Sequence, residues 1–222
     1  MSELNASANV ISSPPFNAAR LLAGINRPDF EAIARWVPSR AHVLDLGCGD
    51  GTLLAKLVAE KQVTGYGVEL NDTNVHECVK KGLNVLQQDL EGGLTFFEDN
   101  SFDVAILSLT LQAVHKTEAM LREIARVGKT AIVSVPNFGY WPHRLSIIKG
   151  RMPVSKTLPY EWYNTPNVRV LTIPDFVKLA ADVGCKVVGQ VVLQDEKAIQ
   201  FMPNWRGSLA VFRLERCLSS FC

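Results

Sequence analysis

The sequence predicts an α/β fold built on a mostly parallel sheet with helices on both faces. Strand-like and helix-like segments alternate along most of the chain, which is the order found in parallel sheets. Residues 102–108 are almost wholly apolar, as expected for a central strand buried on both faces. The glycine-rich segment 47–51 joins a short apolar segment to an amphipathic one, which predicts a strand, a sharp turn and a helix start.

The periodicity of apolar residues predicts each element in turn. The first helix covers about 28–37, where apolar residues recur at i, i+3, i+4 and i+7 from Phe30, and Pro38 ends it. The other predicted helices cover 52–60, 73–81, 117–127 and 174–183. The seven predicted strands cover 43–46, 65–69, 85–88, 102–108, 130–135, 186–193 and 208–214. We expect the last two strands to form an antiparallel pair at one edge of the sheet.

Two segments fall outside this alternation. Residues 1–26 are rich in Ser, Asn and Ala and contain Pro14-Pro15, so we expect a flexible N-terminal arm before a single domain over 27–222. Residues 137–173 hold aromatic side chains and four prolines without a regular period. Irregular segments this long within a domain are usually functional. We therefore expect an insertion that acts as a lid or as a partner-binding surface.

The composition narrows the classes of function. The chain has 222 residues, 47% of them hydrophobic, and a formal net charge of +1, so no basic excess favours nucleic acid as a partner. The five cysteines form neither a CxxC pair nor a Cys/His cluster, so no metal site is expected. No segment has the length and apolarity of a membrane span, and the N-terminus does not resemble a signal peptide. A cytoplasmic protein is the expectation.

Polar side chains lie at the predicted ends of four strands. Asp45 ends the first, Glu69 the second and Ser108 the fourth, while Asp89 follows the third. In an open parallel sheet these ends border one crevice, where a carboxylate can accept ribose hydroxyls or an amino group, or face a cation. Each acid also has a simpler role, such as bonding the backbone of its own turn. A dinucleotide-binding fold is the competing interpretation, but its glycines are spaced G-x-G-x-x-G, unlike the G-x-G-x-G here.

An acid followed by G-x-G-x-G resembles the first motif of class I S-adenosylmethionine-dependent methyltransferases, over roughly residues 28–215. The resemblance implies a Rossmann-like, seven-stranded sheet whose last strand is antiparallel. It also implies that S-adenosylmethionine or S-adenosylhomocysteine binds here. The first motif would hold the methionine end, Glu69 the ribose, and Asp89 with Leu90 the adenine. The implied cofactor-binding residues are Asp45, Gly47, Cys48, Gly49, Gly51, Glu69, Leu70, Asp89, Leu90 and Ser108.

Four further segments resemble the MetW family of methionine biosynthesis proteins. They are residues 107–113, 133–139, 150–154 and 158–167, and they extend the likeness through the irregular region, where nothing generic requires them. The family lies in the acylation branch of methionine synthesis, so the resemblance implies a homoserine O-acyltransferase as partner. The fold alone does not decide whether methyl transfer occurs.

No catalytic residue follows from the sequence. Methyl transfer from a sulfonium is a displacement with a good leaving group, so positioning can suffice without a general base. The candidates are His115, His143, Tyr160, Glu161 and Tyr163. Two hypotheses remain open. The chain is an S-adenosylmethionine-binding accessory protein of methionine biosynthesis, or it is an active methyltransferase acting on a small molecule.

Overall fold

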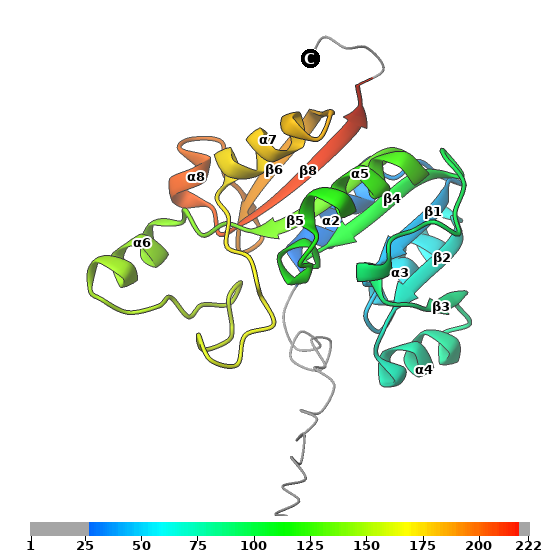
Figure 1. Cartoon of the computed structure of the whole chain (residues 1–222), viewed down its shortest axis with the longest axis horizontal. Helices are drawn as coiled ribbons and strands as arrows, with labels where there is room; N and C mark the ends of the chain where they lie inside the picture. The colour runs from blue at the N-terminus through cyan, green and yellow to red at the C-terminus, as the bar shows by residue number, and fades with distance from the viewer. Residues whose placement is uncertain (1–26, 218–222) are drawn as a thin grey trace, which may run out of the picture.

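The computed structural model describes residues 27–217 and contains a central sheet with helices on both faces (Figure 1). The predicted arm over 1–26 lies outside the described residues. The helices are α2 (Pro28–Trp36), α3 (Thr52–Lys61), α4 (Asp72–Lys80), α5 (Thr117–Val127), α6 (Trp141–Ile148), α7 (Ile173–Asp182) and α8 (Pro203–Arg206), with short 3-10 turns η1 (Leu90–Gly92) and η2 (Leu111–Ala113). The strands are β1 (His42–Leu46), β2 (Thr64–Glu69), β3 (Val85–Gln87), β4 (Phe102–Ser108), β5 (Gly128–Pro136), β6 (Cys185–Gln194), β7 (Lys197–Ala198) and β8 (Leu209–Arg216).

The sheet has eight strands in the order β3-β2-β1-β4-β5-β8-β6-β7. Strands β1 to β5 run parallel, and β8 lies antiparallel between β5 and β6. The prediction of a mostly parallel sheet with an antiparallel last strand is confirmed, but the count of seven strands is wrong. The additional strand is β7, which has two residues and pairs with the end of β6. A strand this short has no periodicity to detect.

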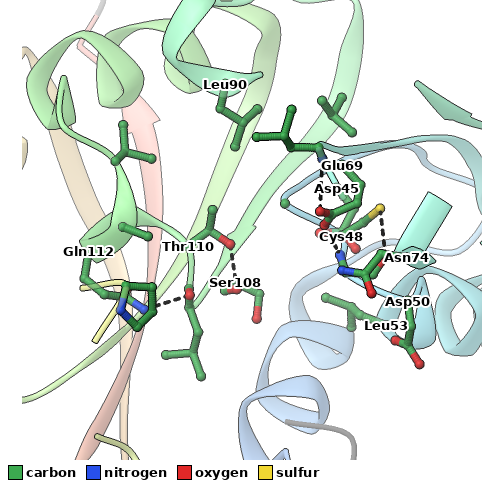
Figure 2. Close-up of a pocket in the computed structure, with 18 of the residues that line it drawn as sticks. Asp45, Cys48, Asp50, Leu53, Glu69, Asn74, Leu90, Ser108, Thr110 and Gln112 are labelled. Atoms are coloured by element: carbon green, nitrogen blue, oxygen red, sulfur yellow. Dashed lines mark hydrogen bonds between the residues drawn. The ribbon is translucent and has the colours of Figure 1, made fainter. Parts of the chain in front are cut away.

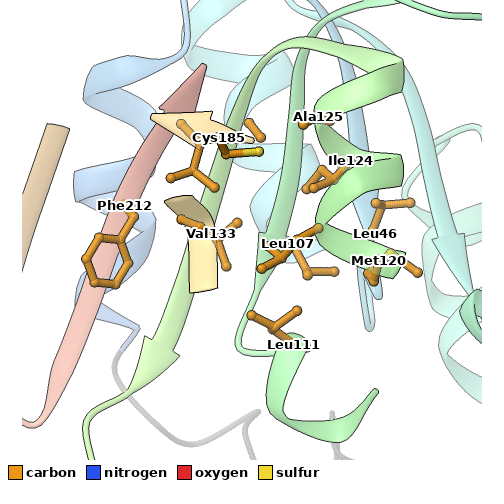
Figure 3. Packing of buried hydrophobic residues seen from close by; sticks show 14 of the residues in the cluster. Leu46, Leu107, Leu111, Met120, Ile124, Ala125, Val133, Cys185 and Phe212 are labelled. Atoms are coloured by element: carbon orange, nitrogen blue, oxygen red, sulfur yellow. The ribbon is translucent and has the colours of Figure 1, made fainter. Parts of the chain in front are cut away.

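Successive side chains of the central strands are buried on opposite faces of the sheet. On one face, Leu107 and Val133 pack against α5 and α7 (Figure 3). On the other face, Ile106 and Ile132 pack against α2 and α3. The two-sided burial explains why β4 is almost wholly apolar. It also confirms that helices cover both faces.

The segment predicted to be irregular contains one helix, α6, which the periodicity did not reveal. Helix α6 leaves apolar side chains in solvent, so its pattern does not point to a buried face. The rest of the insertion is an irregular chain with bends and a turn, and it loops back from α6 to α7 (Figure 1). Among the described residues, every helix is too short or too polar to cross a lipid bilayer.

Candidate functional site

A pocket of about 630 Å³ lies where the strand order reverses, beyond the carboxyl ends of β1 and β4. This is the position at which open α/β sheets bind ligands. Asp45, Cys48 and Glu69 lie on one side of it, and Ser108, Thr110 and Gln112 lie across from them (Figure 2). Of the ten predicted cofactor-binding residues, nine line this pocket. The exception is Gly51, which instead forms the left-handed N-cap of α3.

The glycine turn needs its glycines for conformation and for space. Gly47, Gly49 and Gly51 all have positive φ, at 66°, 57° and 75°. L-residues with a side chain rarely adopt this region. A Cβ atom on Gly47 would lie 2.6 Å from the Thr110 side chain across the pocket. The turn therefore brings bare backbone to the pocket wall, where a ligand can approach it closely.

The Glu69 side chain holds this turn to the next one. Its Oε2 accepts from Gly49 N–H at 2.9 Å. Its Oε1 accepts from Leu70 N–H at 3.0 Å and from Asn71 N–H at 2.8 Å. Each carboxylate oxygen has two lone pairs, so Oε2 keeps one for a hydroxyl in the pocket. Glu69 thus combines the simpler role considered from the sequence with the capacity to bind a ligand.

Asp45 is buried and incompletely bonded. It is 1% exposed, and its Oδ2 has no hydrogen-bond partner. Burial raises the pKa of Asp45 to about 7, opposed by the positive charge of Arg27 and reinforced by Glu69 and Asp29. A buried acceptor left without a donor costs free energy, and natural sites of this kind usually serve a ligand.

A second buried carboxylate, Asp29, lies below the pocket and is fully bonded. Arg27 donates to both of its oxygens, at 2.9 and 2.7 Å, and the hydroxyls of Ser108 and Ser134 donate to Oδ2 at 2.8 and 3.0 Å. Despite its burial, these bonds hold the pKa of Asp29 below its ordinary value. Ser108 thus lines the pocket while serving this network. Sequence reasoning missed Arg27 and Asp29, because no motif links the start of α2 to the ends of β4 and β5.

The pocket wall also includes Asp89, Leu90 and Gln112. Asp89 caps η1 by accepting from Glu91 N–H at 2.9 Å, while Leu90 is partly buried. Gln112 is 6% exposed, its Nε2 donates to the Leu109 carbonyl, and its Oε1 has no partner. Asp45 Oδ2 and Gln112 Oε1, two atoms of the pocket wall that have no hydrogen-bond partner among residues 27–217, are acceptors. The pocket therefore suits a ligand rich in N–H and O–H donors or carrying positive charge.

The candidate catalytic residues lie in different parts of the structure. Tyr160 lines the pocket together with Thr157, Pro159, Pro166 and Asn167, so the insertion forms one wall of it. His115 lies outside the pocket and pairs with Glu91 at 3.3 Å. Tyr163 and Glu161 are exposed.

His143 is buried in the base of the insertion. Its two ring nitrogens lie 3.2 Å from the Asn137 carbonyl oxygen and 2.9 Å from Ser155 Oγ. A histidine bonded at both nitrogens and absent from the pocket wall has a structural role. Among residues 27–217, no group of His, Cys, Asp and Glu side chains is arranged to hold a metal ion.

The fold is that of class I S-adenosylmethionine-dependent methyltransferases. A methyltransferase of that kind from Archaeoglobus fulgidus has 13% sequence identity and a TM-score of 0.65, over 85% of this chain and 91% of its own. Another from Thermotoga maritima, a possible histamine N-methyltransferase, has 21% identity and a TM-score of 0.62, over 85% and 87%. At these identities the likeness shows the fold alone.

The sequence identifies the family. The family of methionine biosynthesis protein MetW matches residues 27–214, and the chain belongs to it. The bifunctional methionine biosynthesis protein MetXA/MetW of Rhodopirellula baltica is 35% identical over 186 residues, which is 79% of this chain. The match spans only 30% of that relative's length.

Proposed function

We propose that this chain binds S-adenosylmethionine or S-adenosylhomocysteine and supports methionine biosynthesis by associating with a homoserine O-acyltransferase. The name of the bifunctional relative is the main support for the proposed partnership. Its name joins MetW to MetXA, a homoserine acyltransferase, in one chain. Fusion keeps two modules at high effective concentration. A separate MetW chain must achieve the same proximity by binding, and it would do so in the cytoplasm, where we expect this protein to act.

The pocket supports the ligand assignment. S-adenosylmethionine carries an ammonium group, ribose hydroxyls and an adenine amine, which are donors for the acceptors described above. Asp45 and the glycine turn would hold the methionine end, Glu69 the ribose, and Asp89 with Leu90 the adenine. The bound ligand would supply a methyl group on a sulfonium, and the chain's own residues would position it and exclude water.

Calorimetric titration with both ligands tests the assignment. Asp45→Asn removes the carboxylate that faces the pocket, and Glu69→Gln keeps the shape of the side chain while removing its charge. Both variants should bind at least tenfold more weakly than wild type, the equivalent of about 1.4 kcal/mol. The matched control is Asp182→Asn, on an exposed carboxylate of α7 that pairs with Lys178. Unchanged affinity in both pocket variants, in samples with wild-type circular dichroism, would remove the ligand assignment.

The partnership is tested with two purified proteins. We expect a homoserine O-acyltransferase and this chain to elute together on gel filtration, and the rate of acyl transfer to change when the chain is added. Separate elution with an unaltered rate contradicts the proposed role, whatever the ligand titrations show.

The second candidate function is methyl transfer to a small molecule. One observation favours it: residues 157–167 of the insertion form a wall of the pocket and can cover an acceptor there. Incubation with methyl-labelled S-adenosylmethionine and homoserine-derived or thiol acceptors tests it. Transfer of label above the background of a heat-denatured sample supports an enzyme, and absence of transfer favours the accessory role.

A further inference from the structure

Helix α6 turns an apolar stripe toward solvent. Trp141, Leu145 and Ile148 lie at i, i+4 and i+7, on one face of the helix, and are 44%, 38% and 80% exposed. The opposite side carries the buried His143. A helix of a monomeric domain normally buries its apolar stripe.

Helix α8, which also exposes apolar side chains, lies next to α6. The guanidinium of Arg144 lies 5.2 Å from the ring centroid of Trp205, and the two short helices lie side by side at one end of the molecule (Figure 1). Just before and within α8, Phe201, Met202 and Trp205 are 69%, 50% and 43% exposed. We call the side chains of Trp141, Leu145, Ile148, Phe201, Met202 and Trp205 the α6–α8 surface. Several exposed large apolar side chains gathered on two neighbouring helices mark an interaction site.

Buried polar bonds hold the surface in place. Asn137 is fully buried, and its Nδ2 donates to the carbonyls of Asn204 at 3.0 Å and Gly207 at 2.7 Å. Its Oδ1 accepts from Gly139 N–H, just before α6, at 2.9 Å. One side chain therefore ties the start of α6 to α8. A preorganised surface loses less conformational entropy when it binds.

Exposed cations lie on or next to both helices. Lys149, Arg151 and Arg206 are exposed, and within residues 27–217 none of them forms an ion pair with a carboxylate. Such a rim favours a partner whose face carries acidic side chains. It also disfavours self-association, because a two-fold interface would set this rim against its own copy.

We propose that the α6–α8 surface docks the homoserine O-acyltransferase, on a face that combines an apolar groove with carboxylates. The inference rests on the proposed function and deepens it by assigning the partner to one face. Trp and Arg anchors beside aliphatic side chains are the composition of a binding hot spot. The pocket opens elsewhere and its lining contains none of these six side chains, so ligand and partner can bind together.

A charged substitution at the most exposed position tests the face. Ile148→Asp places a carboxylate at the C-terminal end of the stripe, where it would be desolvated and would repel an acidic partner. We expect acyltransferase affinity to fall at least tenfold. The matched control is Val79→Asp, at a 61% exposed position on α4, at the other end of the molecule (Figure 1). Binding of S-adenosylhomocysteine equal to wild type shows that the Ile148→Asp variant is folded.

The outcomes separate this inference from the proposed function. Wild type and Val79→Asp binding alike, with Ile148→Asp weakened, supports the α6–α8 surface. Equal binding by all three proteins overturns the surface and leaves the partnership intact. No binding by any of them removes both.

Two further measurements test whether a membrane or a second copy of this chain binds the surface instead. One is flotation with vesicles of phosphatidylserine and phosphatidylcholine. If wild type floats, Ile148→Asp does not, and both bind the acyltransferase alike, the surface belongs to a membrane and the inference fails. The other is analytical ultracentrifugation. A wild-type dimer that Ile148→Asp converts to monomer, with acyltransferase binding unchanged, assigns the surface to a second copy and likewise overturns the inference.

Discussion

Asp45 is positioned for a ligand at the expense of the stability of the fold. It is buried beside two other carboxylates, with one oxygen unbonded, and its pKa is raised to about 7. The unfolded chain ionises this group near its ordinary pKa of 3.8, so between about pH 4 and pH 7 the native state holds more protons than the unfolded state. Stability therefore falls as the pH rises through this range and levels off above it.

Asp45→Asn should remove this pH dependence. A neutral amide has no charge to desolvate. The variant and wild type should therefore have similar stability at pH 4. At pH 8 the variant should be more stable, by at most about 4 kcal/mol for a pKa shift of this size. Thermal unfolding of the ligand-free proteins across this range measures the difference. Parallel profiles for wild type and variant would contradict the assignment of the shift to Asp45.

The acids at the strand ends were predictable residue by residue, and their environments were not. The positions of Asp45, Glu69 and Asp89 follow from strand periodicity, because parallel strands end at the same edge of a sheet. The three backbone bonds of Glu69 and the burial of Asp45 depend on how the loops fold back. The environment of Asp29 was likewise not predictable, because its partners Ser108 and Ser134 are 79 and 105 residues away along the chain.

At the scale of elements, the insertion over 137–173 is divided into two parts with different surroundings. Its first part, α6, faces solvent, and its second part lines the pocket. The predictions of a lid and of a partner surface therefore concern different ends of one segment. His143 joins them, since it bonds the Asn137 carbonyl before α6 and Ser155 after it.

His143→Ala should loosen the insertion while leaving the sheet intact. The change deletes two bonds in a buried site, each of which contributes about 1 kcal/mol. Hydrogen exchange of residues 149–160 should quicken, and that of β4 and β5 should not. His76→Ala, at an exposed position on α4, is the matched control. Unaltered exchange in the insertion would mean that other contacts hold it.

Protonation of His143 at low pH should loosen the insertion in the wild-type protein, as His143→Ala should. Burial lowers the pKa of His143 below its ordinary 6.5, so the unfolded chain takes up this proton first as the pH falls. The contribution of the neutral imidazole is complete above about pH 6.5 and is lost below it.

The whole molecule follows the sequence most closely where periodicity is strong. Seven of the eight strands and the helices on both faces are predictable, because β4 and β5 are buried on two sides and α5 on one. Helix α6 escapes prediction because its apolar stripe faces solvent, which reverses the usual rule. One of the elements that the pattern misses, α6, therefore carries part of the surface that we assign to a partner.

The shared insertion leads us to expect coupling between the two binding events. A ligand that orders residues 157–167 acts on the segment that carries α6, and linkage requires the reverse effect to be equal. Saturating acyltransferase should change the affinity for S-adenosylmethionine by the same factor by which the ligand changes the affinity for the acyltransferase. Two titrations, each with and without the third component, measure both factors. Factors of one in both titrations would show that the two sites are independent.

The buried carboxylate has a consequence for the lifetime of the protein. Above about pH 7 the empty pocket carries an ionised Asp45 whose charge Arg27 offsets only in part, and a bound donor or cation can offset it further. A ligand at one hundred times its dissociation constant adds about 2.7 kcal/mol to the stability of the native state and lowers the unfolded fraction about a hundredfold. Proteases act on that fraction, so the amount of this protein in a cell should follow the concentration of its ligand.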